Sequence, residues 1–239
     1  MAIQNRFIQI TQDEKRDYQY EEAMKTLRTN IQFSGNGLKV IMLTSTMPDE
    51  GKSEISSQLA ISMAQTEERV LFIDADIRKS VLVSRFKVGQ PIYGLAQYLT
   101  GQRLLREVLY HTNLLNLDII FSGPMAPNPA ELLGEDAFSK LIAWARNEYD
   151  TIIIDTPPLG NVIDGAIIAQ RCDGAILLVE SGALSYRLVQ KAKSQLERTG
   201  CRILGAVLNR VDMAGSGYYH RYYGKYSKYT KYYENEPAK

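Results

Sequence analysis

The chain has 239 residues and is poor in cysteine, in net charge and in long apolar segments. Its two cysteines, Cys172 and Cys201, lie far apart in apolar surroundings, which favours reduced, buried thiols over a disulfide. A formal net charge of +1 creates no global field that would demand nucleic acid as a partner. Residues 1–17 contain no apolar core of a secretory signal, and no apolar run approaches the roughly 20 residues that cross a bilayer. We therefore expect a cytoplasmic protein, which only a partner would hold at a membrane.

The apolar residues that are present, 45% of the chain, suffice for one domain with a sizeable core. Short runs of them predict strands, and segments with helical periodicity between these runs predict helices. Because the strands are continuously apolar, the pattern predicts an α/β fold with a doubly wound, mostly parallel sheet and helices on both faces. The predicted strands are 40–43, 69–74, 117–121, 150–158, 174–179 and 202–211, and the predicted helices are 20–33, 53–66, 94–99, 104–110, 130–147, 163–170 and 184–198.

The stretch KVIMLTSTMPDEGKS, residues 39–53, combines a strand, a loop and the first turn of a helix. Its end, Gly51-Lys52-Ser53, matches the Walker A loop GxxxxGK[ST]. In such a loop backbone N–H groups and a helix N-terminus hold phosphate, the lysine adds positive charge, and the hydroxyl binds Mg²⁺. Thr46 stands here in place of the first glycine of the pattern. The loop alone therefore leaves open a surface turn that happens to contain Gly-Lys-Ser.

Three aspartates end predicted strands: Asp74 and Asp76 follow RVLFI, and Asp155 follows TIII. The carboxyl ends of parallel strands meet along one edge of a sheet, where ligands bind. Each aspartate alone could cap a helix, but three beside a phosphate loop suit Mg²⁺–nucleotide chemistry. Asp155 fits the role of orienting Mg²⁺. Asp74 and Asp76 offer one carboxylate for the metal and one for the proton of an attacking hydroxyl.

Two other polar residues follow predicted strands. Arg78 would contact phosphate or a carboxylate, and Asn209 would contact the nucleotide base or belong to a simple loop. Nothing in the sequence resembles a protease, a metal cluster or a dinucleotide site of the Rossmann type.

The composition changes from residue 215, where tyrosines alternate with Lys, Arg, Gly and Ser and aliphatic residues almost disappear. Such a segment cannot build a core and is expected to be disordered. It could stack on single-stranded nucleic acid, accept phosphate groups that would turn it acidic, or be an idle tail. Joined to a nucleotide site, the cluster favours phosphate acceptance. Its tyrosines are Tyr218, Tyr219, Tyr222, Tyr223, Tyr226, Tyr229, Tyr232 and Tyr233.

The predicted helix 20–33 carries Glu22, Lys25 and Arg28 on one side and Ala23, Met24, Leu27 and Ile31 at core-facing positions. The charged side is either a solvated face or a contact surface for another subunit. The chain thus divides into a leader and helix (1–33), a nucleotide-binding domain (34–214) and a tyrosine-rich tail (215–239).

Taken together, these motifs resemble the bacterial tyrosine kinases (BY-kinases) of capsule and exopolysaccharide synthesis, of the CpsD/CapB type. The resemblance runs from about Tyr20 to the C-terminus. It rests on the following segments: EEAMKTLRTNI, the Walker A variant STMPDEGKS, the Walker A′ segment VLFIDADIR, GPMAPNPAELL, the Walker B segment IIIDTPP, GAVLNRVD and the tyrosine cluster. Loops of this family often begin with Ser or Thr, as at Thr46.

The resemblance implies autophosphorylation of the tail tyrosines with ATP and Mg²⁺, the tail of one subunit entering the site of its neighbour. It implies catalytic roles for Lys52, Asp74, Asp76 and Asp155, and metal binding by Ser53, Asp76 and Asp155. The nucleotide would be bound by Thr46, Asp49, Glu50, Gly51, Lys52, Ser53, Glu54 and Asn209.

The resemblance also implies partners. These are the cytoplasmic segment of a membrane adaptor, which would place the protein at the inner face of the membrane, a cognate tyrosine phosphatase, and copies of the chain itself in a ring. The ring motif ExxRxxR reads Glu22, Lys25, Arg28 here, and Lys25 lacks the planar fork of arginine. No nucleic acid is expected as a partner.

The alternative is a positioning ATPase of the ParA/MinD type, which shares the expected fold. Those proteins carry a second, signature lysine early in the phosphate loop, where this chain has Met47, and they lack a tyrosine cluster. The sequence therefore favours the kinase.

Overall fold

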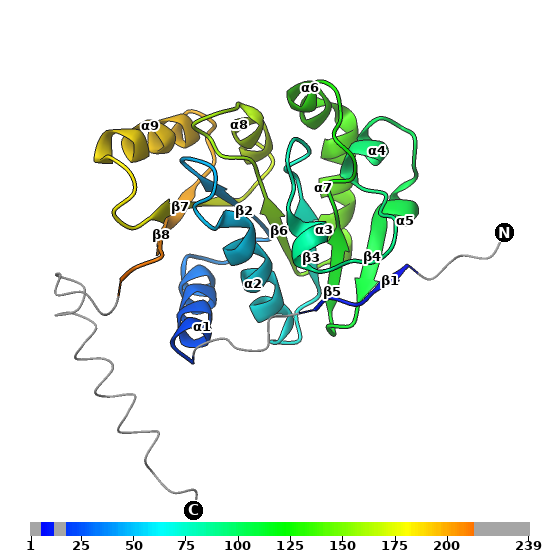
Figure 1. Cartoon of the computed structure of the whole chain (residues 1–239), viewed down its shortest axis with the longest axis horizontal. Coiled ribbons are helices and arrows are strands. Elements are labelled where there is room, and N and C mark those ends of the chain that lie inside the picture. The colour runs from blue at the N-terminus through cyan, green and yellow to red at the C-terminus, as the bar shows by residue number, and fades with distance from the viewer. Residues whose placement is uncertain (1–5, 12–17, 213–239) are drawn as a thin grey trace, which may run out of the picture.

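The computed structural model describes residues 6–11 and 18–212, and the eight tail tyrosines lie outside this range. One eight-stranded sheet crosses the described part in the order β1-β4-β5-β3-β6-β2-β7-β8 (Figure 1). Neighbouring strands are parallel except β4 and β5, so the predicted α/β fold with a mostly parallel sheet is confirmed. The strands are β1 (Phe7–Ile8), β2 (Val40–Ser45), β3 (Val70–Asp74), β4 (Leu109–Thr112), β5 (Leu117–Ile120), β6 (Thr151–Asp155), β7 (Gly174–Glu180) and β8 (Ile203–Asn209).

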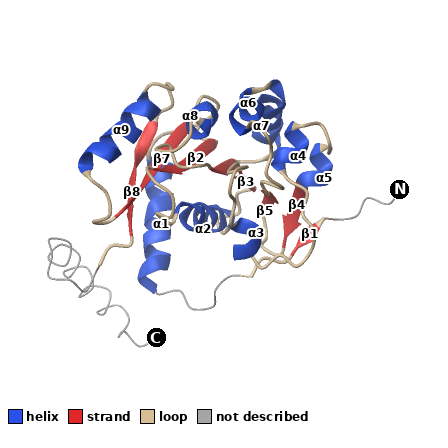
Figure 2. Cartoon of the chain, turned by 45° about the horizontal axis from the view of Figure 1, so that its top comes forward, coloured by secondary structure: helices blue, strands red, loops and turns tan. Residues whose placement is uncertain are grey.

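Helices cover both faces of the sheet (Figure 2). One face carries α1 (Tyr18–Phe33), α2 (Lys52–Ala64) and α3 (Leu82–Arg85). The other carries α4 (Leu95–Leu99), α5 (Leu105–Val108), α6 (Pro129–Gly134), α7 (Asp136–Glu148), α8 (Asp164–Ala169) and α9 (Tyr186–Glu197). No helix in the described part has the length and apolarity needed to pass through a membrane.

The central strand β2 shows why the strands are continuously apolar. Val40 and Met42 belong to the core on the α7 side, whereas Ile41 and Leu43 belong to the core on the α2 side. Successive side chains of a strand point to opposite faces, so a strand covered on both faces needs an apolar residue at every position. The same burial fixes β2 between β6 and β7, and thereby fixes the start of the phosphate loop.

Several predicted elements were wrong in detail. The region 104–110 was predicted as one helix, but α5 ends at Val108 and β4 begins at Leu109. β1 was missed because two residues carry no periodicity, and its strand forms only by pairing with β4. The helix predicted at 130–147 is two helices, since Glu135 has an extended backbone.

The faces of two helices also differ from the prediction. The helix predicted at 53–66 is buried nearly all round, because α2 packs on the sheet and also against α1, which lies beside it on the same face. On α1 itself Ala23 is exposed, whereas Met24 and Ile31 are buried.

Candidate active site

The phosphate loop runs from the end of β2 to the start of α2. Asp49 and Gly51 have left-handed backbones, with φ of 64° and 86°, whereas Thr46 does not have a positive φ. A side chain at Gly51 would also meet Asn209, whose Nδ2 would lie 2.3 Å from an added Cβ. Glycine is therefore required at the second glycine of the pattern, and Thr46 meets no conformational obstacle at the first.

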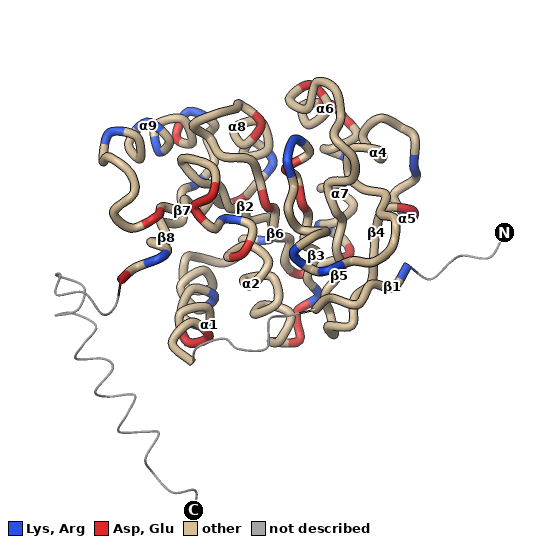
Figure 3. The backbone as a smooth tube through the Cα atoms, viewed as in Figure 1, with Lys and Arg blue, Asp and Glu red and all other residues tan. Residues whose placement is uncertain are grey.

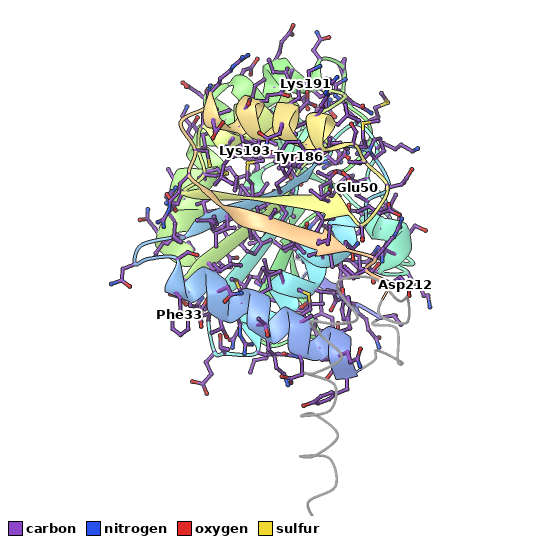
Figure 4. All side chains as sticks on the ribbon, turned by 90° about the vertical axis from the view of Figure 1, so that its left-hand side faces the viewer. Phe33, Glu50, Tyr186, Lys191, Lys193 and Asp212 are labelled. Atoms are coloured by element: carbon purple, nitrogen blue, oxygen red, sulfur yellow. The ribbon has the colours of Figure 1, made fainter. Side chains whose placement is uncertain are left out.

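Two residues predicted to bind nucleotide hold the loop in shape. The buried carboxylate of Glu50 accepts hydrogen bonds from the backbone N–H of Met47 (2.7 Å) and of Glu180 (3.1 Å). The side-chain amide of Asn209 donates to the backbone carbonyl of Glu50 (2.8 Å). Figure 4 shows Glu50 beyond the carboxyl ends of β7 and β8, at the end of the sheet opposite to Phe33. Glu180 at the end of β7 and Asn209 at the end of β8 therefore hold the phosphate loop through hydrogen bonds to Glu50.

Lys52, the Walker lysine, lies against the carboxylate that ends β6. Its Nζ is 2.8 Å from Asp155 Oδ1 and 3.3 Å from Ser53 Oγ. Ser56 donates a further hydrogen bond to the same Asp155 oxygen (2.8 Å). Both members of the ion pair are buried, Lys52 being 7% and Asp155 1% exposed. The structure thus brings the predicted lysine, hydroxyl and carboxylate together at one point.

Asp74 lies beside this pair at the end of β3, where its Cα is in register with that of Asp155. Its Oδ2 accepts hydrogen bonds from the Ser80 hydroxyl and from the backbone N–H of Ser122. Burial, together with the nearby charge of Asp155, raises the pKa of Asp74 to about 7. This carboxyl can therefore hold or release a proton near neutral pH.

Three buried oxygen atoms at this edge have no hydrogen-bond partner in the described structure: Thr46 Oγ1, Asp74 Oδ1 and Asp155 Oδ2. Buried polar atoms are nearly always paired in native proteins, so such a group marks a place for a missing ligand. Carboxylate and hydroxyl oxygens are the donors that Mg²⁺ takes, usually together with phosphate oxygens. The residues present therefore fit a Mg²⁺–nucleotide group.

A pocket of about 310 Å³ lies at this edge of the sheet, and its lining includes Ser45, the chain neighbour of Thr46, and Lys52, which pairs with Asp155. Figure 3 shows acidic and basic residues together along the loops that follow β2 and β3, which form its walls. Of the predicted site residues, Asp49, Gly51, Lys52, Ser53, Glu54 and Asp76 line it. The others, Thr46, Glu50, Asp74, Asp155 and Asn209, are not among the residues that line it. The lining also includes the basic residues Arg78, Lys79, Arg85 and Arg210.

Arg78 contacts a carboxylate that the sequence prediction did not identify. Its Nε and Nη2 donate to Asp164 Oδ2 (2.7 Å) and Oδ1 (2.9 Å), a bidentate pair with the fully buried first residue of α8. Ser56 and Ser80 were also missed. In one sequence these residues look like ordinary helix and loop positions, and no spacing rule pairs them with Asp155, Asp74 or Arg78.

The predicted subunit contact lies on α1, away from the pocket. Lys25 pairs with Glu22 at 2.6 Å on the exposed face. Arg28 instead donates to the carbonyl and hydroxyl oxygens of Ser62 on α2. Part of this motif therefore serves packing within the chain.

Comparison with known proteins agrees with this geometry. A family model described as an AAA domain matches residues 38–198. The protein named tyrosine-protein kinase CpsD of Streptococcus pneumoniae serotype 4 is 46% identical over 198 residues, covering 83% of this chain and 87% of that protein. The protein of the same name from Streptococcus agalactiae serotype III is 44% identical over 83% of this chain and 85% of its own.

Two solved structures resemble the chain, the first in fold alone and the second also in family. MinD from Pyrococcus horikoshii, complexed with Mg-ADP, has a TM-score of 0.63 at 23% identity, covering 74% of this chain and 72% of that one, a likeness of fold. Fold, loop and carboxylates thus define a P-loop nucleotide-binding protein. The kinase domain of the Escherichia coli tyrosine kinase ETK has a TM-score of 0.76 at 32% identity, covering 88% of this chain and 94% of that domain. The chain belongs to the bacterial tyrosine-protein kinase family that includes CpsD and ETK.

Proposed function

We propose that this chain is an ATP- and Mg²⁺-dependent tyrosine autokinase that phosphorylates its own C-terminal tyrosine cluster and thereby regulates capsule or exopolysaccharide synthesis. The observation that carries the proposal is the meeting of Lys52, Asp155 and Asp74 under a phosphate loop, in a chain that belongs to a tyrosine-kinase family. Family membership favours this function over that of a ParA/MinD-type ATPase.

The nucleotide is bound by the chain's own loop and helix. The backbone N–H groups that precede α2 and the Lys52 ammonium hold the phosphates, and Lys52 exchanges part of its contact with Asp155 for phosphate oxygen. Ser53, Asp76 and Asp155 would hold Mg²⁺, which neutralises the charge of the phosphates when it is bound. Asp49, Glu54 and the peptide at Gly51 line the same pocket.

The two aspartates after β3 have different positions and so different roles. Asp76 lines the pocket and meets the phosphates and metal first. Asp74, with its pKa near 7, accepts the proton of the attacking phenol. The Ser80 hydroxyl donates to Oδ2 of Asp74, so Oδ1, which has no partner in the described structure, is the atom that accepts the phenol proton.

The acceptors are the eight tyrosines between Tyr218 and Tyr233, presented by a neighbouring copy of the chain. Their number favours a graded change of charge, since each phosphate adds roughly −1.5 to −2 charges to a basic segment. The cytoplasmic segment of a membrane adaptor activates the enzyme and holds it at the inner face of the membrane. A tyrosine phosphatase removes the phosphate groups. Ring contacts between copies of the chain involve Glu22, Lys25 and Arg28.

The test is a phosphosite map of the purified chain after incubation with ATP·Mg²⁺, with and without the adaptor segment. We expect several phosphates, all within residues 218–233, and more of them with the segment present. Release of phosphate from ATP without any labelled tyrosine would refute the kinase and favour a positioning ATPase. A truncated chain lacking residues 218–239 is the matched control, and it should bind nucleotide yet remain unlabelled.

A further inference from the structure

The ion pair between Arg78 and Asp164 joins two parts of the site. Arg78 follows β3 and lines the pocket, whereas Asp164 begins α8, after the loop that follows β6. Asp164 is 0% exposed, and the two hydrogen bonds of 2.7 and 2.9 Å come from Nε and Nη2, which form one edge of the guanidinium. A buried carboxylate is costly unless it is paired with good geometry, so Asp164 depends on Arg78 and fixes its orientation.

The same arginine anchors the turn that carries Asp76. Asp76 Oδ1 accepts the backbone N–H of Lys79 at 3.0 Å and that of Arg78 at 3.3 Å. The start of α8 is itself held close, because a Cβ on Gly165 would lie 3.0 Å from Leu159 and 3.3 Å from the Pro157 carbonyl oxygen. The fork therefore connects the Asp76 turn to the segment behind Asp155.

The guanidinium also has an unused edge. Nε and Nη2 point to Asp164, and Nη1 has no hydrogen-bond partner among residues 6–11 and 18–212. The side chain is 35% exposed and forms part of the pocket wall. One edge is thus fixed by a buried partner while the other remains available to a ligand in the pocket.

The other arginines of the wall are held differently. Arg85 pairs with Glu54 (3.2 Å) and Arg210 with Glu180 (2.9 Å), in pairs whose members are all partly or largely exposed. Such pairs contribute little and reorient easily. Among the arginines that line the pocket, only Arg78 is oriented by a fully buried carboxylate, as Lys52 is oriented by the buried Asp155.

We propose that Arg78 contacts the phosphoryl group during its transfer and that Asp164 is the positioning residue that aims it. The inference rests on the proposed nucleotide chemistry. In the step the phenol oxygen bonds to the γ-phosphorus, the bond to the β–γ bridging oxygen breaks, ADP leaves with that electron pair, and the phenol proton passes to Asp74. Negative charge on the transferring oxygens is met by the free edge of Arg78.

If the Arg78 guanidinium contacts the transferring phosphoryl group, substitutions at Arg78 or Asp164 should weaken binding of a transition-state mimic more than binding of Mg·ADP. In the full chain, Arg78→Lys keeps a charge but loses the fork, and Asp164→Asn keeps the shape but loses the charge of its partner. Affinity for Mg·ADP should stay within about 3-fold of wild type, whereas the gain in affinity on adding aluminium fluoride, which mimics the transferring phosphoryl group, should fall by roughly 10-fold or more. Adding Asp164→Asn to Arg78→Gln should cause no further loss, because Asp164 acts through Arg78.

The matched control is a second bidentate pair, Arg146–Asp173, at the other end of the sheet. Arg146→Lys should lower the melting temperature and leave the fluoride effect unchanged. A wild-type fluoride effect in Arg78→Lys would overturn the proposal, as would additive losses in the double variant. If Asp164→Asn does not fold, Arg78→Lys decides alone. Because the readout needs no tyrosine, an unlabelled tail would refute the autokinase and leave this test valid.

Discussion

The two ends of the sheet use carboxylates in opposite ways. At the amino end Asp173 accepts hydrogen bonds from the N–H groups of Lys39 and Val40 and from Nη1 and Nη2 of Arg146. Although burial acts in the other direction, these hydrogen bonds hold the pKa of Asp173 below its ordinary value. At the carboxyl end Asp74 and Asp155 are more deeply buried, and each has one oxygen without a partner.

The difference separates stability from function within one fold. The pairing of Asp173 stabilises the folded chain because every strong interaction is made before any ligand arrives. Asp74 and Asp155 each leave one buried oxygen unpaired, which costs folding stability that an oxygen-binding ligand would restore. Destabilised groups of this kind concentrate at functional sites, and the following substitutions test that contrast.

The largest effect is expected at the lysine that follows β2. Lys52→Met removes the positive charge beside Asp155 and the phosphates, so tail phosphorylation should fall by at least about 100-fold. Initial rates of phosphate incorporation measure this. The matched control is Lys39→Met at the amino end, where Nζ donates to the carbonyls of Arg146 and Tyr149. Lys39→Met should be less stable but should phosphorylate the tail at the wild-type rate. A loss of phosphorylation rate in both variants would contradict the separation of function and stability between the two ends of the sheet.

The amino end should respond in stability alone. Asp173→Ala leaves two backbone N–H groups and Arg146 without their acceptor, so the free energy of unfolding should fall by about 2–3 kcal/mol. Urea denaturation measures the change, and the rate per folded molecule should remain as in wild type. A rate loss larger than the loss of folded protein would mean that the two ends are coupled.

Replacing Asp74 should change the free energy of unfolding in the opposite direction to replacing Asp173. Its pKa is about 7 in the folded chain against an ordinary value of 3.8. As pH rises between these values the unfolded chain releases the proton and the folded chain keeps it, so the contribution of Asp74 to stability falls across this window and is level above it. Asp74→Asn should therefore make the nucleotide-free protein more stable above pH 7, by about 1–3 kcal/mol, and change little near pH 4.

Chemical denaturation at several pH values checks this prediction, and the same variant should lose most of its kinase activity because it lacks the proton acceptor. Asparagine retains an oxygen for the hydrogen bonds from Ser80 and Ser122. Equal stability of variant and wild type at pH 8 would show that Asp74 is not destabilising.

The sequence predicted the central strands, the phosphate loop and the aspartates at the strand ends for one physical reason. A strand buried on both faces carries its signal in its own residues, and a parallel sheet places the strand ends along one edge. β1 and β4 could not be predicted in this way. They lie at the sheet border, and Phe7–Ile8 becomes a strand only through its partner.

Local sequence patterns also could not predict which side chains pair with each other across the site. Arg78 and Asp164 are 86 positions apart, and nothing near Asp164 distinguishes it from an acidic residue at a helix start. Glu50 and Asn209 were assigned to the nucleotide from their place in the loop and after the last strand. Their hydrogen bonds to Met47, Glu180 and Glu50 could be found only in three dimensions.

The smallest expected effect concerns Thr46, whose buried hydroxyl has no partner. Thr46→Val keeps the shape and removes an unpaired polar atom, so the nucleotide-free protein should gain up to about 1 kcal/mol of stability. If that hydroxyl serves a phosphate, affinity for ATP·Mg²⁺ should fall about 3- to 10-fold. Thermal unfolding and calorimetric titration measure the two changes. Because the expected changes have opposite signs, a loss of both stability and affinity would mean that Thr46 supports the fold, and unchanged affinity would remove it from the nucleotide site.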